Sequence, residues 1–147
     1  MTRVVAGLIE RDGRLLICQR RGGGALGLQW EFPGGKLKAS ETPRQGLTRE
    51  LREELGVTAQ IGAEIYRTQH RYAGLGLTVR ITFFSVPAIS QRPQNRVFER
   101  MAWVRPNELP KYDFLPADRE LVRWIARRQL SLVGEHRIRR DSSPRSE

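Results

Sequence analysis

The segment from Thr42 to Leu55 constrains the fold most, because it predicts a single helix with one apolar face and a crowded acidic border. Thr42 is a suitable N-cap, Pro43 fits the first helical position, and Gly56 predicts the stop. The apolar residues of the segment recur every four positions; they are Leu47, Leu51 and Leu55. This spacing is typical of a helix that buries one face against a core.

Three glutamates of this helix converge beside its apolar face. At about 100° per residue, Glu50, Glu53 and Glu54 fall within an arc of about 100°. Like charges at these spacings repel each other, and the second half of a helix is the negative end of its dipole. A divalent cation would relieve both penalties, and carboxylate oxygens suit Mg²⁺ or Mn²⁺. The alternative is a solvated helix in which arginines such as Arg49 pair with the acids.

The remaining patterns predict a single α+β domain. Asp12-Gly13 lies between two short apolar runs and predicts a β-hairpin, whereas the glycines of residues 22–27 precede an aromatic strand and predict a loop. Strands are expected at residues 4–9, 15–18, 61–72, 77–86 and 96–104. A second helix is expected from Pro116 or Ala117 to Leu130, with Leu121 and Ile125 facing inward.

Composition excludes several classes of protein. One cysteine, Cys18, rules out an internal disulfide framework, and two histidines leave too few ligands for a structural zinc site. No apolar run is long enough to span a membrane, so we expect a cytoplasmic protein. The net charge of +10 indicates either a surface that attracts nucleotides and other polyanions or an ordinary arginine-rich surface.

The spacing of residues from Gly35 to Val57 decides between a metal site and a solvated helix. Five residues separate Gly35 from Glu41, seven more lead to Arg49-Glu50-Leu51, and Glu53-Glu54, Gly56 and Val57 complete the pattern. This is a complete match to the Nudix box, G-x5-E-x7-R-E-U-x-E-E-x-G-U, where U is aliphatic. The stretches Trp30–Lys36 and Leu115–Asp118 also resemble the MutT-like branch of the Nudix hydrolases.

The resemblance covers roughly residues 3–130 and implies a particular fold and reaction. It implies an α/β/α sandwich around a mixed sheet at residues 1–130. By their composition, residues 131–147 are expected to form a polar basic tail. It also implies Mg²⁺-dependent hydrolysis of a nucleoside triphosphate to monophosphate and pyrophosphate, with Mn²⁺ as a possible substitute. The favoured role is cleaning of the nucleotide pool.

The resemblance further implies roles for individual residues. Metal ligands are expected among Gly35 (through its carbonyl), Glu50, Glu53, Glu54 and Glu99. Glu50 or Glu53 would orient or deprotonate the attacking water, and Arg49 would hold a carboxylate in place. Substrate contacts are expected from Arg20 and Lys36 to the triphosphate and from Phe32, Phe83 and Asp118 to the base, although Phe83 also fits a core position.

Two positions depart from the family pattern. Gly46 stands where such helices usually carry alanine, at a cost of about 1 kcal/mol in helix stability. Val97 stands where many members carry a further metal-binding glutamate; Glu99 is the nearest acid, and it shares strand parity with Trp103.

The sequence is compatible with several nucleotide substrates. Members that remove 8-oxo-guanine nucleotides carry asparagine at the place of Asp118, and an ionised aspartate offers acceptors only, which suit the amine of cytosine. A buried, protonated aspartate would donate as well and still read 8-oxo-guanine. Oxidised purine triphosphates such as 8-oxo-dGTP are therefore favoured, with CTP or dCTP next and other nucleoside diphosphate derivatives after them. A nucleic-acid-binding module is the non-enzymatic alternative, but all box carboxylates are present, so no stable nucleic-acid complex is expected.

Overall fold

A computed structural model describes residues 1–128 of the chain. The predicted basic tail at 131–147 and the last residues of the predicted second helix lie outside this described part. Residues 1–128 contain two helices, α1 at Pro43–Leu55 and α2 at Arg119–Arg128, with short 3₁₀ turns at Ala73–Leu75, Pro106–Lys111 and Pro116–Asp118. Neither helix is long and apolar enough to cross a membrane.

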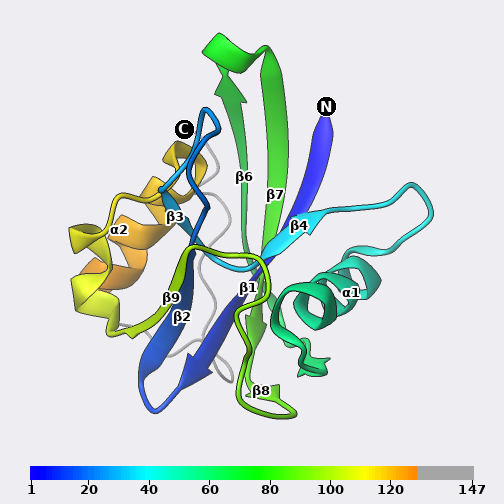
Figure 1. The fold of residues 1–147 in the computed structure, drawn as a ribbon, viewed down its shortest axis with the longest axis vertical. Coiled ribbons are helices and arrows are strands. Elements are labelled where there is room, and N and C mark those ends of the chain that lie inside the picture. The colour runs from blue at the N-terminus through cyan, green and yellow to red at the C-terminus, as the bar shows by residue number, and fades with distance from the viewer. Residues whose placement is uncertain (129–147) are drawn as a thin grey trace.

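A mixed sheet of seven strands forms the centre of the molecule (Figure 1). Its strands are β1 (Thr2–Arg11), β2 (Arg14–Gln19), β3 (Trp30–Glu31), β4 (Gly34–Lys36), β6 (Glu64–Tyr72), β7 (Leu77–Val86) and β9 (Arg100–Val104). β1 is the hub, because it pairs parallel with β7 and antiparallel with both β2 and β4. The remaining strands, β5 (Ala59–Gln60) and β8 (Ala88–Ile89), form a separate two-stranded sheet.

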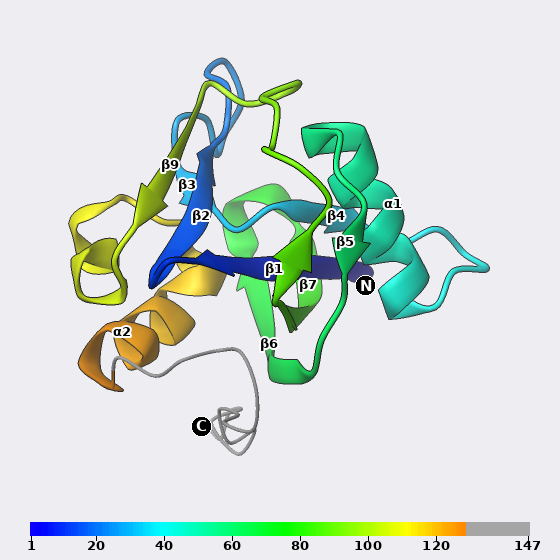
Figure 2. The same cartoon turned by 90° about the horizontal axis from the view of Figure 1, so that it is seen from below.

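Each helix covers one face of the sheet, which gives the predicted α/β/α sandwich (Figure 2). The alternation of side chains along β1 sends Val5 and Ile9 toward α1 and Ala6 and Leu8 toward α2. The α1 core contains Leu47, Leu51 and Leu55, and the α2 core contains Leu121, Val122 and Ile125. The single α+β domain predicted from the sequence is therefore confirmed.

The predicted ends of α1 are confirmed in detail. The Thr42 hydroxyl accepts a hydrogen bond from the Gln45 amide, and the Gln45 side chain accepts one from the Thr42 amide, which forms a capping box. Gly56 ends the helix in the left-handed conformation at φ 69°. These caps fix where the glutamates of α1 lie relative to the sheet.

Two strands begin three or four residues later than predicted. The strand expected from residue 61 begins at Glu64, and the strand expected from residue 96 begins at Arg100. The second difference has a clear cause, because residues 94 and 96 donate backbone hydrogen bonds to the carbonyls of Leu55 and Glu54 at the end of α1. The segment before β9 therefore satisfies the free carbonyls of a helix instead of extending a strand.

The glycine at position 46 has a packing role. Gly46 is buried, and a Cβ atom built there would lie 2.2 Å from Cδ2 of Leu37 and 3.2 Å from a carboxylate oxygen of Glu41. Glycine lowers the helix propensity at this position, but the absence of a side chain allows close contact between α1 and the loop that carries Leu37.

Candidate active site

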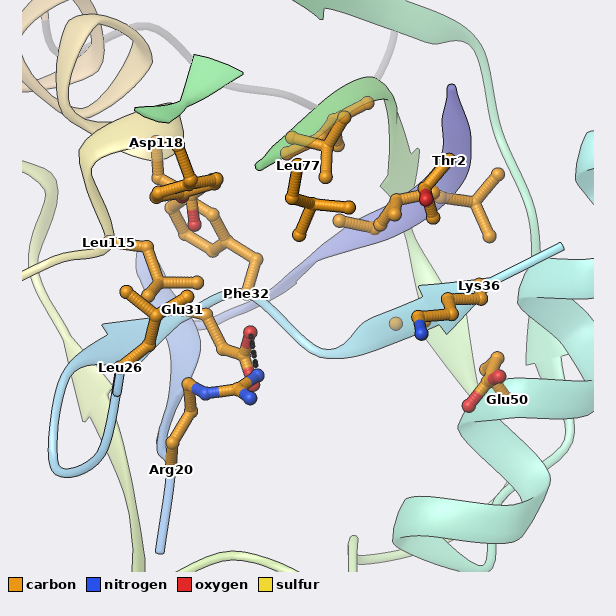
Figure 3. A pocket seen from close by; sticks show the side chains of 18 of the residues that line it. Thr2, Arg20, Leu26, Glu31, Phe32, Lys36, Glu50, Leu77, Leu115 and Asp118 are labelled. Atoms are coloured by element: carbon orange, nitrogen blue, oxygen red, sulfur yellow. Dashed lines mark hydrogen bonds and ion pairs between the residues drawn. The ribbon is translucent and has the colours of Figure 1, made fainter. Parts of the chain in front are cut away.

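A cavity of about 440 Å³ is lined by residues of the sheet and by two glutamates of α1. Its two ends differ in chemistry (Figure 3). We call the end formed by Gly34, Gly35, Lys36, Glu50 and Glu54 the carboxylate end, and the end formed by Glu31, Phe32, Tyr72, Leu115 and Asp118 the aromatic end. Val79 and Ile81 of β7 also line the cavity.

Glu54 is the most perturbed acid of the carboxylate end. Its Oε1 accepts a hydrogen bond of 3.2 Å from the Gly34 amide, and its carboxyl is hydrogen-bonded to that of Glu50. Burial, together with the charges of Glu50 and Glu31, raises the pKa of Glu54 to about 9. At neutral pH this carboxyl therefore holds a proton that a bound cation would displace.

Gly35 allows β4 to approach α1 closely. A Cβ atom built on Gly35 would lie 2.5 Å from the carboxylate carbon of Glu50 and equally close to one of its oxygens. Only a glycine leaves room for this carboxylate against the strand. The first glycine of the box is thus explained by the position of Glu50.

Arg49 holds the acids of the box in place. It is hydrogen-bonded to Glu41 through both Nε and Nη2, to Glu50 through Nη1 at 3.1 Å, and to Glu53 through Nη1 at 3.2 Å. Nη2 also donates to the Lys36 carbonyl on β4. The Arg49 side chain does not line the cavity. Arg49 therefore contacts three carboxylates of the box, and the paired guanidinium lowers the pKa of Glu41 to about 2.

The predicted metal ligands are only partly brought together. Glu50 and Glu54 line the cavity beside Gly35, whereas Glu53 is 57% exposed and Glu99 is exposed, and neither of these two lines the cavity. Across residues 1–128, no three His, Cys, Asp or Glu side chains converge closely enough to hold a metal alone. This arrangement fits Mg²⁺, which typically binds one or two carboxylates and completes its shell with water and substrate phosphates.

Asp118 dominates the aromatic end. Asp118 is only 3% exposed, and it lies in the 3₁₀ turn that leads directly into α2. Burial and the nearby charge of Glu31 raise the pKa of Asp118 well above its usual range, although a hydrogen bond from the Phe32 backbone opposes the shift. A neutral Asp118 carries both a hydrogen-bond donor and an acceptor.

Arg20 and Glu31 lie side by side at the cavity wall (Figure 3). Nη1 of Arg20 and Oε1 of Glu31 are 3.4 Å apart. Burial raises the pKa of Glu31 to about 7 even though Arg20 acts in the opposite direction. Lys36, the other predicted phosphate contact, is exposed and lines the carboxylate end. Both predicted cations therefore face the cavity.

The two predicted aromatic contacts have different positions. Phe32 lines the cavity, whereas Phe83 is fully buried beneath it and meets Phe32 edge to face with ring centroids 6.2 Å apart. Phe83 does not line the cavity, so a stacking role is wrong and its alternative as a core residue holds. The reason is its register opposite Ala6 and Tyr66 at the centre of the sheet.

Sequence reasoning missed Glu31 and Tyr72 as cavity residues. Tyr72 accepts a hydrogen bond of 3.3 Å at its hydroxyl from the Ala117 amide, so its own proton is free to point elsewhere. Glu31 had a visible signal, because it is a lone acid in the apolar stretch Trp30–Pro33. Tyr72 had none, since only the pairing of β6 with β7 places it here.

Comparison with known proteins identifies the family of this site. The family model described as NUDIX domain matches residues 4–124. The chain belongs to the NUDIX domain family. This Nudix chain is 38% identical over 122 residues to the CTP pyrophosphohydrolase of Escherichia coli K12, an alignment that covers 83% of the chain and 89% of that relative. It is 36% identical to the 8-oxo-dGTP diphosphatase of Haemophilus influenzae, and the alignment covers 82% of this chain and 88% of that relative.

A solved structure extends the similarity to the fold. The solution structure of the E. coli ORF135 protein superimposes on this Nudix chain with a TM-score of 0.78 at 33% identity, covering 92% of this chain and 95% of that one.

Proposed function

We propose that the protein hydrolyses nucleoside triphosphates to monophosphate and pyrophosphate in the presence of Mg²⁺. The observation that carries this proposal is one cavity that joins a pair of crowded carboxylates to an aromatic, hydrogen-bonding end. The carboxylate end suits a metal-bound triphosphate, and the aromatic end suits a base. The named relatives, a CTP pyrophosphohydrolase and an 8-oxo-dGTP diphosphatase, support the same reaction class.

The roles of the chain's own residues follow from their positions. Glu50 and Glu54, with the Gly35 carbonyl, would hold Mg²⁺, which supplies charge neutralisation at the phosphates and a lowered pKa for bound water. Glu53 is exposed and, within residues 1–128, its side chain is paired with Arg49, so it would turn toward the phosphates when substrate binds. Glu50 or Glu53 would orient or deprotonate the attacking water. Arg20 and Lys36 would contact the triphosphate.

The burial of Asp118 raises its pKa and so favours the neutral carboxyl, which bears on the choice of base. A neutral carboxyl donates one hydrogen bond and accepts another, so it matches a base edge with a donor beside an acceptor. The oxidised guanine of 8-oxo-dGTP has such a pair at N7–H and O6, whereas ordinary guanine presents two acceptors there. We propose 8-oxo-dGTP as the favoured substrate on this match together with the similarity to an 8-oxo-dGTP diphosphatase.

Cytosine is the second candidate. Its N4 amine lies beside the N3 acceptor, so a neutral Asp118 matches this edge equally well. The similarity to a CTP pyrophosphohydrolase is the specific observation that favours it. The two candidates share one mechanism and differ only in the base that fills the aromatic end.

A panel of normal and oxidised nucleoside triphosphates tests the proposal. With Mg²⁺, we expect pyrophosphate as the first product and the highest kcat/KM for 8-oxo-dGTP, followed by dCTP or CTP. Hydrolysis in ¹⁸O-labelled water should place the label in the monophosphate or the pyrophosphate. Orthophosphate as the first product, or full activity after chelation by EDTA, would contradict the mechanism.

A further inference from the structure

Four arginines gather on the face of the sheet that carries α1, beyond the part that the helix covers. The strand register places Arg3 of β1 opposite Arg80 of β7, and Arg80 opposite Gln69 of β6. Opposite residues of paired strands share one face, and so do residues two positions apart, which adds Arg67 and Arg71. All four are exposed. We call Arg3, Arg67, Arg71 and Arg80 the arginine face; in Figure 1 these strand ends extend beyond α1.

Little negative charge offsets this cluster. Arg67 is paired with Glu64, and Arg71 donates a hydrogen bond of 3.0 Å to the hydroxyl of Thr78. In the described part of the chain, Arg3 and Arg80 form no ion pair and no side-chain hydrogen bond. At least three positive charges are therefore available to an anionic partner.

We propose that the arginine face binds the sugar-phosphate backbone of a nucleic acid duplex. The arginines alternate across the strands with Gln69, Thr78 and Thr82, and these side chains are typical donors to phosphate oxygens. The array is about 13 Å long between Arg67 and Arg71 and about 10 Å wide across three strands. It thus offers a flat grid of donors that several phosphates can contact at once.

The composition of the face favours a duplex over a single strand or a membrane. The aromatic side chains of β6, at Tyr66, His70 and Tyr72, alternate to the opposite face, so the arginine face has no platform on which unpaired bases stack. Its polar residues also offer no apolar side chain for insertion among lipids. Contacts to phosphates alone predict binding without sequence preference.

The part of the cavity that β1 and β7 line lies mostly on the other side of these strands, and α1 supplies its carboxylate end. Thr2 and Val79 are paired, as are Val4 and Ile81, and all four line the cavity. A duplex on the arginine face would therefore leave the cavity open to nucleotides. Binding of this type is weak at physiological salt, with a Kd of roughly 10⁻⁴–10⁻⁶ M, so the complex would be transient.

The test is the salt dependence of duplex binding, measured by the fluorescence anisotropy of a short labelled duplex. For four phosphate contacts, log K should fall against log salt with a slope of about −3.6, which is about 150-fold weaker binding between 50 and 200 mM. The triple variant Arg3→Gln, Arg71→Gln, Arg80→Gln should bind more weakly, with a slope of about −0.9.

A second triple variant controls for net charge. Arg92→Gln, Arg105→Gln, Arg123→Gln removes the same charge from exposed positions elsewhere, and it should keep the parental slope. Thermal unfolding and nucleotide hydrolysis of both variants should match the parent, because none of these side chains lines the cavity. If the first variant fails to fold, Arg80→Gln alone should still reduce the slope by about 0.9.

Several results would overturn the proposal. One is equal weakening by the two triple variants, since that would assign binding to net charge alone. Another is tighter binding to a single strand, or to phosphatidylserine vesicles, than to the duplex. A parent protein that does not bind the duplex at low salt would overturn it as well.

Discussion

The two adjacent glutamates Glu53 and Glu54 have contrasting surroundings. Glu54 is partly buried and bonded to Gly34, whereas Glu53 is largely exposed and touches Arg49. We predict that Glu54→Gln and Glu53→Gln each lower kcat by about 100-fold or more, because each removes a negative oxygen that the metal and the attacking water require. Steady-state kinetics with Mg²⁺ measure this effect.

The two variants should differ in proton release. The raised pKa of Glu54 means that Mg²⁺ binding near pH 8 expels close to one proton from the parent, which calorimetry in buffers of different ionisation enthalpy detects. Glu54→Gln should abolish this release and Glu53→Gln should retain it. The surface variant Glu108→Gln should leave both kinetics and proton release unchanged; near-parental turnover of Glu54→Gln would exclude the proposed metal site.

Asp118 gives a prediction about the choice of base. Its folded-state pKa is raised, so the neutral form that donates and accepts is present at low pH and is lost as pH rises through that pKa. The preference of the parent for 8-oxo-dGTP over dGTP should therefore fall in alkaline buffer. Asp118→Asn keeps a donor and an acceptor at every pH and should hold its preference constant, whereas Asp118→Ala should lose about tenfold in kcat/KM.

The ratio of kcat/KM for the two nucleotides across pH is the measurement. Taking a ratio removes the titration of the metal site, which both substrates share. A parental ratio that stays flat between neutral and alkaline pH would show that Asp118 does not read the base through its proton.

At the scale of secondary structure, the contact between β4 and α1 gives a prediction for Gly35. A methyl group at this position would occupy the place of the Glu50 carboxylate. We expect Gly35→Ala to lower kcat by at least tenfold. The free energy of unfolding should fall by about 1–2 kcal/mol, because the added methyl group displaces one side chain at the rim of the core. Kinetics and urea unfolding of the same preparation separate the two effects.

Gly24→Ala is the matched control. Gly24 has no heavy atom within 4 Å of an added Cβ, so this variant should behave as the parent in both assays. Full activity of Gly35→Ala would show that Glu50 works from another position.

The elements differ in how far the sequence predicts them. α1 was predicted to the residue because its signals are local: Thr42, Pro43 and Gly56 each act within one helical turn. The beginning of β9 was predicted wrongly because residues 94 and 96 bond to the end of α1, which is distant in sequence. The same distinction separates the box glutamates, fixed by spacing on one helix, from Tyr72, which reaches the cavity only through sheet pairing.

For the whole molecule, the buried acids predict an unusual pH dependence of stability. The pKa values of Glu31 and Glu54 rise from an ordinary 4.5 to about 7 and about 9 in the folded state. At pH values between the unfolded-state pKa of 4.5 and these raised pKa values, the folded protein holds protons that the unfolded chain has released. The free energy of unfolding of the metal-free protein should therefore fall as pH rises from about 5 to about 9.

Thermal unfolding across this pH range, with and without Mg²⁺, measures the dependence. Mg²⁺ should restore stability most at the alkaline end, where its binding no longer competes with the Glu54 proton. Glu54→Gln should flatten the curve of the metal-free protein. A melting temperature that rises with pH in the absence of metal would contradict the assignment.

The parallel pairing of β1 with β7 has a consequence for the order in which the chain folds. It joins residue 2 to residue 79, so β2, β3, β4, α1, β5 and β6 all lie within the loop that this pairing closes. Long-range closure of this kind is slow compared with helix formation, because the chain loses conformational entropy before the stabilising contacts between β1 and β7 have formed. During synthesis α1 can form from local signals alone. The wall that Val79 and Ile81 give the cavity cannot exist until β7 has left the ribosome.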